Sequence, residues 1–207
     1  MSEAPGVELV HQGAPPEAVC YLETGLCKLV RLQADGRRVI VGLRGAGRFV
    51  AAEAAILRRP SPVTAITLST CQVSRLDSGR FRDLIRTNPE LSWRLHNLQS
   101  EELYLETSRL ADVGALSARQ RLLQFLDRFH EGIPEDGESV AGVRFRVALK
   151  QWEIAQLIAV APQYLSALIR QLEAEGLLRR EGDAFVLRRR SSLRSPSRVA
   201  RSPTKED

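Results

Sequence analysis

The chain has 207 residues, of which 43% are hydrophobic and 27% charged, and its formal net charge is +5. These values are ordinary for a globular protein and allow two small domains with modest cores. No apolar run reaches the length of a secretory signal or a membrane span, so we expect a cytoplasmic protein with no membrane partner.

Residues 9–77 are predicted to form a small antiparallel roll or barrel. Short apolar runs with β-branched residues alternate there with turn signals, such as the glycine at Gly25. The dipeptide Asp35-Gly36 predicts a hairpin between two of these runs. Two further strands are expected within residues 63–77.

A long helix is predicted over residues 89–113, after a shorter one over 79–89. Its apolar residues lie three, four and seven positions apart, which places them on one stripe. We favour pairing of this stripe with a second copy of the chain. The alternative is that it covers the roll of its own chain. The predicted dimer seam consists of Leu91, Leu95, Leu98 and Leu105, and Trp93, Leu103 and Leu110 widen it.

Another helix is predicted over residues 114–129, with Ser117 as its N-cap. A polar loop at 130–139 and a strand within 140–149 are expected to follow it.

Residues 149–180 have the pattern of two short helices joined by a tight turn. Apolar residues recur at helical spacing on both sides of the break at 159–162, and Pro162 suits the first turn of the second helix. A second helix with a polar outer face is the arrangement that reads the major groove. Two strands around Gly182-Asp183 complete a winged helix-turn-helix, for which the predicted partner is double-stranded DNA.

The segment 188–207 holds seven arginine and lysine residues against two acidic ones, so it carries the whole net charge. Its Ser/Pro/Arg-rich composition cannot bury a core, and we predict a disordered basic tail over 189–207. Beside a DNA-reading domain we favour phosphate binding by this tail over a solvated segment with no partner.

The order of these parts resembles the Crp-Fnr superfamily, named after the cyclic-AMP receptor protein and the fumarate-nitrate regulator. The segment 9–50 looks like the opening strands of the family's cyclic-nucleotide-binding roll, and 80–95 like the entry to its dimer helix. Residues 116–126 and 149–178 look like its DNA-binding domain. The sequence begins at the family's first roll strand, so either this member is short or its start codon is misassigned.

The resemblance implies an α+β fold: a β-roll sensor domain (1–88), a dimerisation helix (89–113) and a winged helix-turn-helix (114–188), followed by the tail. It implies a homodimeric, sequence-specific transcription regulator, with RNA polymerase as a further candidate partner. The alternative is a ligand-sensing or protein-interaction module that has lost specific DNA reading. This alternative is motivated by the net charge of −1 over residues 149–187, where four basic residues face five acidic ones.

The sensor positions depart from the family pattern. Nucleotide-binding members have a Gly-Glu pair at the ribose and an Arg-Ser or Arg-Thr pair at the phosphate, where this chain has Ala51-Ala52 and Ser61-Pro62. Without a fixed arginine fork, a cyclic phosphate loses its bidentate contacts. We therefore expect a degenerate sensor that binds no cyclic nucleotide and whose effector is unknown. The candidate effector pocket comprises Glu53, Arg58, Arg59, Ser61, Thr107 and Ser108.

The reading residues also depart from the pattern. At the positions of the usual Glu and Arg of the recognition helix stand Gln163 and Ala167, and Ser166 matches a base-reading serine. Gln pairs bidentately with adenine, whereas Ala contacts only a thymine methyl group. Ala159 replaces the usual turn glycine, at a cost of up to about 1 kcal/mol if its backbone is left-handed. Phosphate contacts are expected from Lys150, Gln151, Tyr164, Arg170, Arg188, Arg189 and Arg190.

The three cysteines, Cys20, Cys27 and Cys71, match neither a metal-ligand spacing nor the N-terminal cluster of the iron-sulfur members. We expect small buried thiols rather than a redox switch or a metal site, and hence no metal and no cofactor. The sequence contains no nucleophile at a base spacing, no phosphate-binding glycine loop and no paired acids in a motif. We therefore expect no catalytic residues and no enzymatic activity.

Overall fold

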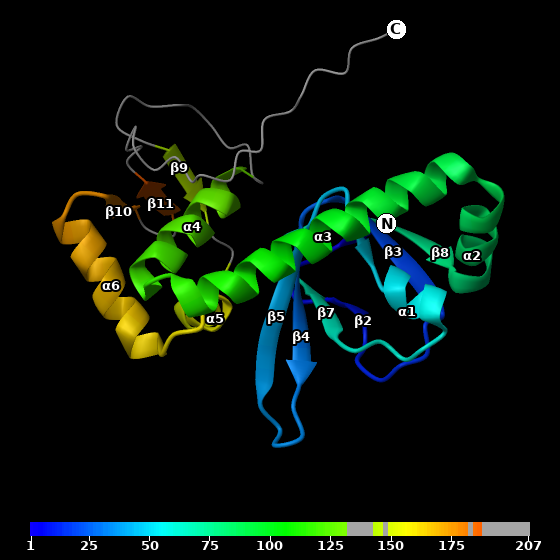
Figure 1. Ribbon diagram of the computed structural model, residues 1–207, viewed down its shortest axis with the longest axis horizontal. Coiled ribbons are helices and arrows are strands. Elements are labelled where there is room, and N and C mark those ends of the chain that lie inside the picture. The colour runs from blue at the N-terminus through cyan, green and yellow to red at the C-terminus, as the bar shows by residue number, and fades with distance from the viewer. Residues whose placement is uncertain (132–142, 147–148, 182–183, 188–207) are drawn as a thin grey trace, which may run out of the picture.

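The computed structural model describes residues 1–131, 143–146, 149–181 and 184–187, which form a β-roll, a long helix and a helical domain with a small sheet (Figure 1). The helices are α1 (Ala52–Leu57), α2 (Ser78–Thr87), α3 (Pro89–Ala115), α4 (Ala118–Glu131), α5 (Gln151–Leu157) and α6 (Pro162–Ala174). The strands are β1 (Ser2–Glu3), β2 (Glu8–Val10), β3 (Ala18–Thr24), β4 (Leu26–Leu32), β5 (Arg38–Gly45), β6 (Phe49–Val50), β7 (Thr64–Thr67), β8 (Cys71–Asp77), β9 (Val143–Arg146), β10 (Leu178–Glu181) and β11 (Ala184–Leu187). None of the described helices is long and apolar enough to cross a membrane.

The roll consists of two four-stranded antiparallel sheets, with strand orders β1-β8-β3-β6 and β2-β7-β4-β5. Their inner faces bury one apolar cluster that includes all three cysteines. The prediction of buried thiols is therefore confirmed. Burial raises the pKa of Cys27 to about 12, which keeps this thiol protonated and unreactive at neutral pH. Within the described residues, no group of His, Cys, Asp and Glu side chains is arranged to hold a metal ion.

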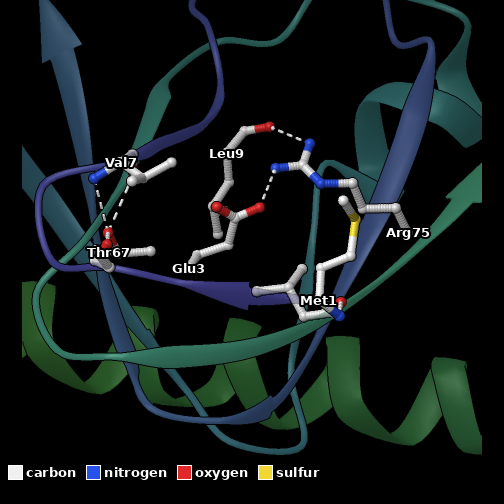
Figure 2. Close-up of polar contacts among 8 residues, drawn as sticks. Met1, Glu3, Val7, Leu9, Thr67 and Arg75 are labelled. Atoms are coloured by element: carbon white, nitrogen blue, oxygen red, sulfur yellow. Dashed lines mark hydrogen bonds and ion pairs between the residues drawn. The ribbon is translucent and has the colours of Figure 1, made fainter.

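The N-terminal residues lie across the roll as short strands (Figure 2). The α-amino group of Met1 donates to the carbonyl oxygen of Val73 at 2.8 Å, where β1 begins to pair with β8. The guanidinium of Arg75 donates to the carboxylate of Glu3 and to the carbonyl oxygen of Leu9, both at 3.3 Å. These contacts join β1 and β2, which belong to different sheets, through one side chain of β8.

The helix α1 interrupts the region that we predicted as strands only. Its six residues are too few to show a helical period in the sequence. Ala52 and Ala55 are buried against Phe81 of α2 and Leu95 of α3, so the packing of small side chains holds the helix in place.

The dipeptide Asn88-Pro89 ends α2 and begins α3, as its residue types predict. The side chain of Asn88 accepts a hydrogen bond from the backbone N–H of Leu91 at 3.0 Å and caps α3. From this point α3 runs beside the roll to the helical domain (Figure 1).

One part of the predicted dimer seam lies inside the chain. Leu95 is only 5% exposed, because it packs on the roll, and Leu91 and Leu98 are half-buried. We therefore revise the predicted seam, since a side chain in its own core is not available to a second copy. The large apolar residues that α3 leaves exposed are Trp93, Leu103, Tyr104, Leu105, Leu110 and Val113.

The helical domain contains the predicted helix-turn-helix, formed by α5 and α6, and a sheet in the order β10-β11-β9. Ser117 caps α4 as predicted, since its hydroxyl accepts from the backbone N–H of Gln120 at 3.3 Å. The strands β10 and β11 form the predicted wing. Its turn at 182–183 and most of the predicted polar loop at 130–139 lie outside the described residues.

Ala159 in the turn of the helix-turn-helix has a φ of 54°, so it adopts the left-handed conformation in which a side chain is strained. The substitution Ala159→Gly is therefore expected to raise the free energy of unfolding by about 0.5–1 kcal/mol, after allowing for the greater flexibility of glycine in the unfolded chain. Denaturant unfolding followed by circular dichroism measures this change. Ala167→Gly, in the exposed middle of α6, is the matched control and should lower stability. A destabilised Ala159→Gly variant would contradict the prediction.

Candidate nucleic-acid interface and sensor region

The helix α6 has one buried and one exposed face. Leu165, Leu168, Ile169 and Leu172 are buried against the rest of the domain. Gln163, Ala167 and Arg170, at positions i, i+4 and i+7, are exposed on the opposite side. Three of the predicted DNA-contacting residues thus share one stripe. Tyr164 lies next to it with 53% of its surface exposed.

Two other predicted contact residues lie where the helices meet. The hydroxyl of Ser166 donates to the side-chain oxygen of Gln151 at 3.4 Å and to the carbonyl oxygen of Pro162 at 3.2 Å. Both side chains are half-buried, whereas Lys150, which precedes α5, is exposed. The single hydroxyl proton is shared between these two acceptors, whereas the oxygen lone pairs can still accept a hydrogen bond from a base amino group. Arg188, Arg189 and Arg190 lie outside the described residues.

The turn between α5 and α6 is held by an arginine that the sequence analysis did not single out. Arg121 of α4 donates from Nε to the carbonyl oxygen of Ile158 at 2.9 Å and from Nη2 to that of Ala159 at 3.4 Å. Its Nη1 donates to the carbonyl oxygen of Leu116 at 2.6 Å, just beyond the end of α3. Helix ends leave carbonyl oxygens without a partner in the helix, and this side chain supplies donors to two helix ends at once. A single arginine within an amphipathic helix gives no sequence signal for this role.

The predicted effector residues differ in exposure. Glu53, Arg58, Arg59 and Thr107 are exposed, and Ser108 is half-buried. Ala51 and Arg58, at the two ends of α1, have left-handed backbones with φ of 65° and 52°. Neither Arg58 nor Arg59 is buried, so neither supplies a fixed guanidinium inside the roll.

Ser61 is buried, and its hydroxyl is used within its own loop. It donates to the carbonyl oxygen of Val63 at 2.7 Å and accepts from the N–H of Val63 at 3.4 Å. The backbone of Ser61 is also bonded, to Gly13 and Ala14. The position aligned with the family's phosphate arginine therefore holds a side chain engaged in a turn.

Two arginines connect the roll to α3. Arg44 pairs with Glu102 at 3.0 Å, and Arg48 pairs with Glu101 at 2.9 Å while also donating to the carbonyl oxygen of Leu98. Burial raises the pKa of Glu102, and the neighbouring Arg44 only partly opposes this effect. The two pairs join adjacent residues of α3 to the end of β5 and to the loop before β6.

Comparison with known proteins agrees with both halves of this architecture. Residues 3–88 match the cyclic nucleotide-binding domain family, and residues 120–195 match the Crp-like helix-turn-helix domain family. The chain belongs to the Crp-Fnr superfamily. Among its Crp-Fnr relatives is the cAMP-activated global transcriptional regulator CRP of Salmonella typhimurium, which is 22% identical over 183 residues that cover 86% of this chain and 84% of the relative.

Solved structures show that the whole Crp-Fnr fold is shared. FixK2 from Bradyrhizobium japonicum has a TM-score of 0.78 at 19% identity and covers 91% of both chains. The c-di-GMP responsive global regulator CLP of Xanthomonas campestris has a TM-score of 0.77 at 20% identity and covers 92% of this chain and 93% of its own. This Crp-Fnr protein is thus a transcription regulator of the CRP family, with a nucleotide-binding type of roll and a DNA-binding domain.

Proposed function

We propose that this regulator binds DNA as a homodimer, reads its operator through α6, and uses a roll that takes no cyclic nucleotide. The observation that carries the proposal is the exposed stripe of Gln163, Ala167 and Arg170 on a helix whose other face is buried. A glutamine and an arginine two turns apart offer donors and acceptors to base edges and phosphates. In a two-fold dimer the two stripes would enter successive major grooves, roughly 34 Å apart.

The proposal of a homodimer is supported by the outer face of α3. Leu103, Thr107 and Leu110 follow one another at spacings of four and three residues, and Leu103 and Leu110 are 69% and 76% exposed. This is the period of a parallel coiled-coil seam. Large apolar side chains on an otherwise amphipathic helix are costly to leave in water, and a second copy of α3 would cover them.

The proposal of a degenerate sensor is supported by the side chains around the roll. Ser61 is bonded within its loop, and Arg58 and Arg59 are exposed. The described roll arginines nearest α3, Arg44 and Arg48, already pair with carboxylates of α3. An anionic ligand would have to break these pairs before it gained a guanidinium.

Selection of bound duplexes from a random pool tests the proposed function. We expect a palindromic consensus with half-sites about 10 base pairs apart, since a two-fold dimer presents two equivalent readers. The selected duplex and a scrambled one are then titrated at several salt concentrations. The selected duplex should be bound at least about 10³-fold more tightly than the scrambled duplex. Equal binding of both duplexes at every salt concentration would favour the protein-interaction alternative. The net charge of −1 over residues 149–187 is consistent with that alternative.

Deletion of residues 189–207 tests the basic tail, which lies outside the described residues. The salt dependence of DNA affinity should become shallower, by about 0.9 in the log–log slope for each phosphate that the tail neutralises. The preference for the selected duplex over the scrambled one should remain. Fluorescence anisotropy over a range of salt concentrations measures both quantities. An unchanged slope would remove the tail from the DNA interface.

Isothermal titration calorimetry with cyclic AMP and cyclic GMP tests the sensor. We expect no binding in the micromolar range, because no described guanidinium is held at the phosphate position. The variant in which Arg58 and Arg59 are both alanine is the control, because it shows whether any heat of binding depends on these two arginines. Micromolar binding that disappears in this variant would contradict the proposal and assign the phosphate contact to one of these arginines.

A further inference from the structure

The roll and the DNA-binding domain share one buried apolar cluster. Val30 of β4 and Ile40 of β5 belong to the same cluster as Leu126 of α4 and as Ile154 and Leu157 of α5. The β4–β5 hairpin therefore packs on the helix-turn-helix directly, although more than a hundred residues separate them in the sequence.

The hairpin backbone is bound by the side chain of Gln156 on α5. Its Oε1 accepts from the N–H of Ile40 at 3.0 Å, and its Nε2 donates to the carbonyl oxygen of Arg38 at 3.3 Å. An amide side chain that fills one donor and one acceptor of a strand mimics a neighbouring strand. This contact fixes both the position of α5 along the hairpin and its rotation.

A second contact joins the hairpin to the start of α5. Lys28 of β4 forms an ion pair with Glu153, a buried residue with 2% of its surface exposed. The other carboxylate oxygen of Glu153 accepts from the N–H of Lys150 at 2.7 Å and caps α5. A buried carboxylate requires such partners, so the helix N-terminus and the roll are linked through one side chain.

A third contact joins the hairpin, α3 and the far end of α5. The pairing of β4 with β5 shifts register between Leu29 and Val30, and this bulge leaves Val41 without a partner residue. Arg109 of α3 donates to the carbonyl oxygen of Val41 at 3.0 Å and to that of Leu157 at 2.8 Å. The guanidinium therefore spans the bulge and the last turn of α5.

We propose that these three contacts form an interdomain clamp, made of Lys28, Arg109, Glu153 and Gln156, which fixes the orientation of the recognition helix with no ligand bound. Of the two helices of the helix-turn-helix, the clamp contacts only α5. It leaves Gln163, Ala167 and Arg170 of α6 exposed, so the fixed orientation is one in which the reading stripe is accessible. The four clamp residues are positioning residues that hold the reader at a constant angle to α3.

Electron–electron resonance distances between spin labels test the clamp without DNA. Labels are attached to Glu90→Cys at the start of α3 and Ala174→Cys at the end of α6, both exposed. Cys20, Cys27 and Cys71 are buried and should stay unlabelled. The labelled chain is mixed with excess unlabelled chain, so that each dimer carries one labelled copy. We expect a single narrow distance distribution for the otherwise unchanged chain and a broad or double one for the variant Q156A/R109Q.

Matched controls separate the clamp from general effects of substitution. Q33A removes an exposed glutamine of the same hairpin, and R86Q removes an exposed arginine of α2; both should keep the narrow distribution. Sedimentation of each variant verifies its oligomeric state. A broad distribution in the unsubstituted protein, or a narrow one in Q156A/R109Q, would overturn the proposal.

DNA affinity provides the second readout, and this arm alone rests on the proposed function. In Q156A/R109Q the affinity for a selected two-half-site duplex should fall about tenfold, because it scales with the fraction of readers held in the competent orientation. A tighter complex would overturn the proposal, since the clamp would then hold the reader away from DNA. If no duplex is bound specifically, the proposed function fails, whereas the distance measurement still decides the clamp.

Discussion

The variant Leu110→Glu is expected to be monomeric and to bind a two-half-site duplex at least about 100-fold more weakly, because a monomer loses the avidity of the second reader. Leu110 is 76% exposed in the single chain, so its replacement leaves the monomer core intact. In a paired α3 seam the same position would bury a carboxylate next to its own copy, which is strongly unfavourable. Sedimentation equilibrium and anisotropy measure the two effects.

Leu84→Glu on α2 is the matched control for this change. Leu84 is also exposed, at 43%, but it lies on a face that we do not assign to the dimer. This variant should remain dimeric with unchanged DNA affinity and unfolding temperature. Leu110→Glu should keep the circular dichroism spectrum of the parent protein but unfold at a lower temperature, because it lacks the stabilisation that dimerisation provides. A dimeric Leu110→Glu variant with full affinity would exclude the α3 stripe as the seam.

The second large effect is expected from Gln163→Ala. A bidentate contact between glutamine and adenine contributes about 1–3 kcal/mol of discrimination, and a dimer makes it twice. The binding free energy for the selected duplex should therefore become about 2–6 kcal/mol less favourable, while that for a scrambled duplex stays the same. Gln163 is exposed and outside the buried face of α6, so the fold should be unaffected.

Gln171→Ala is the control on the same helix, because Gln171 is an exposed glutamine two turns after Gln163 whose side chain already donates to Glu175. A set of duplexes with each half-site base changed in turn identifies the base that Gln163 reads. On the duplex that lacks this base, Gln163→Ala should weaken binding no further. An equal decrease on selected and scrambled duplexes would assign Gln163 to phosphate contact instead of base reading.

Local chemistry made much of the fold predictable from the sequence. Asn88-Pro89 ends one helix and begins the next because asparagine caps a helix and proline tolerates its first turn. Asp35-Gly36 forms a hairpin because glycine accepts a positive φ, here 80°. The strain expected at Ala159 depended on a left-handed backbone, and the structure has that backbone.

Other features left no local signal. The short helix α1 depends on the packing of alanines against α2 and α3, which the sequence does not reveal. The apolar stripe of α3 could be recognised in the sequence. The sequence did not show which of its residues pack on the roll of the same chain and which stay exposed. Leu95 faces the roll and Leu110 faces solvent, because the position of the roll beside α3 decides which part of the stripe is covered.

The order of the parts, which are the roll, the long helix and the winged helix-turn-helix, was predictable from the residues alone, because capping, turn chemistry and hydrophobic period act over a few residues. The shared exposed stripe of Gln163, Ala167 and Arg170 also follows from their spacing, since residues four and seven positions apart on one helix lie on the same face. The contacts of the proposed clamp, in which Lys28 pairs with Glu153 and Arg109 bridges Val41 and Leu157, could be seen only in the folded chain. Partners so far apart in the chain are brought together by the packing of the roll on the reading domain, which no local pattern encodes.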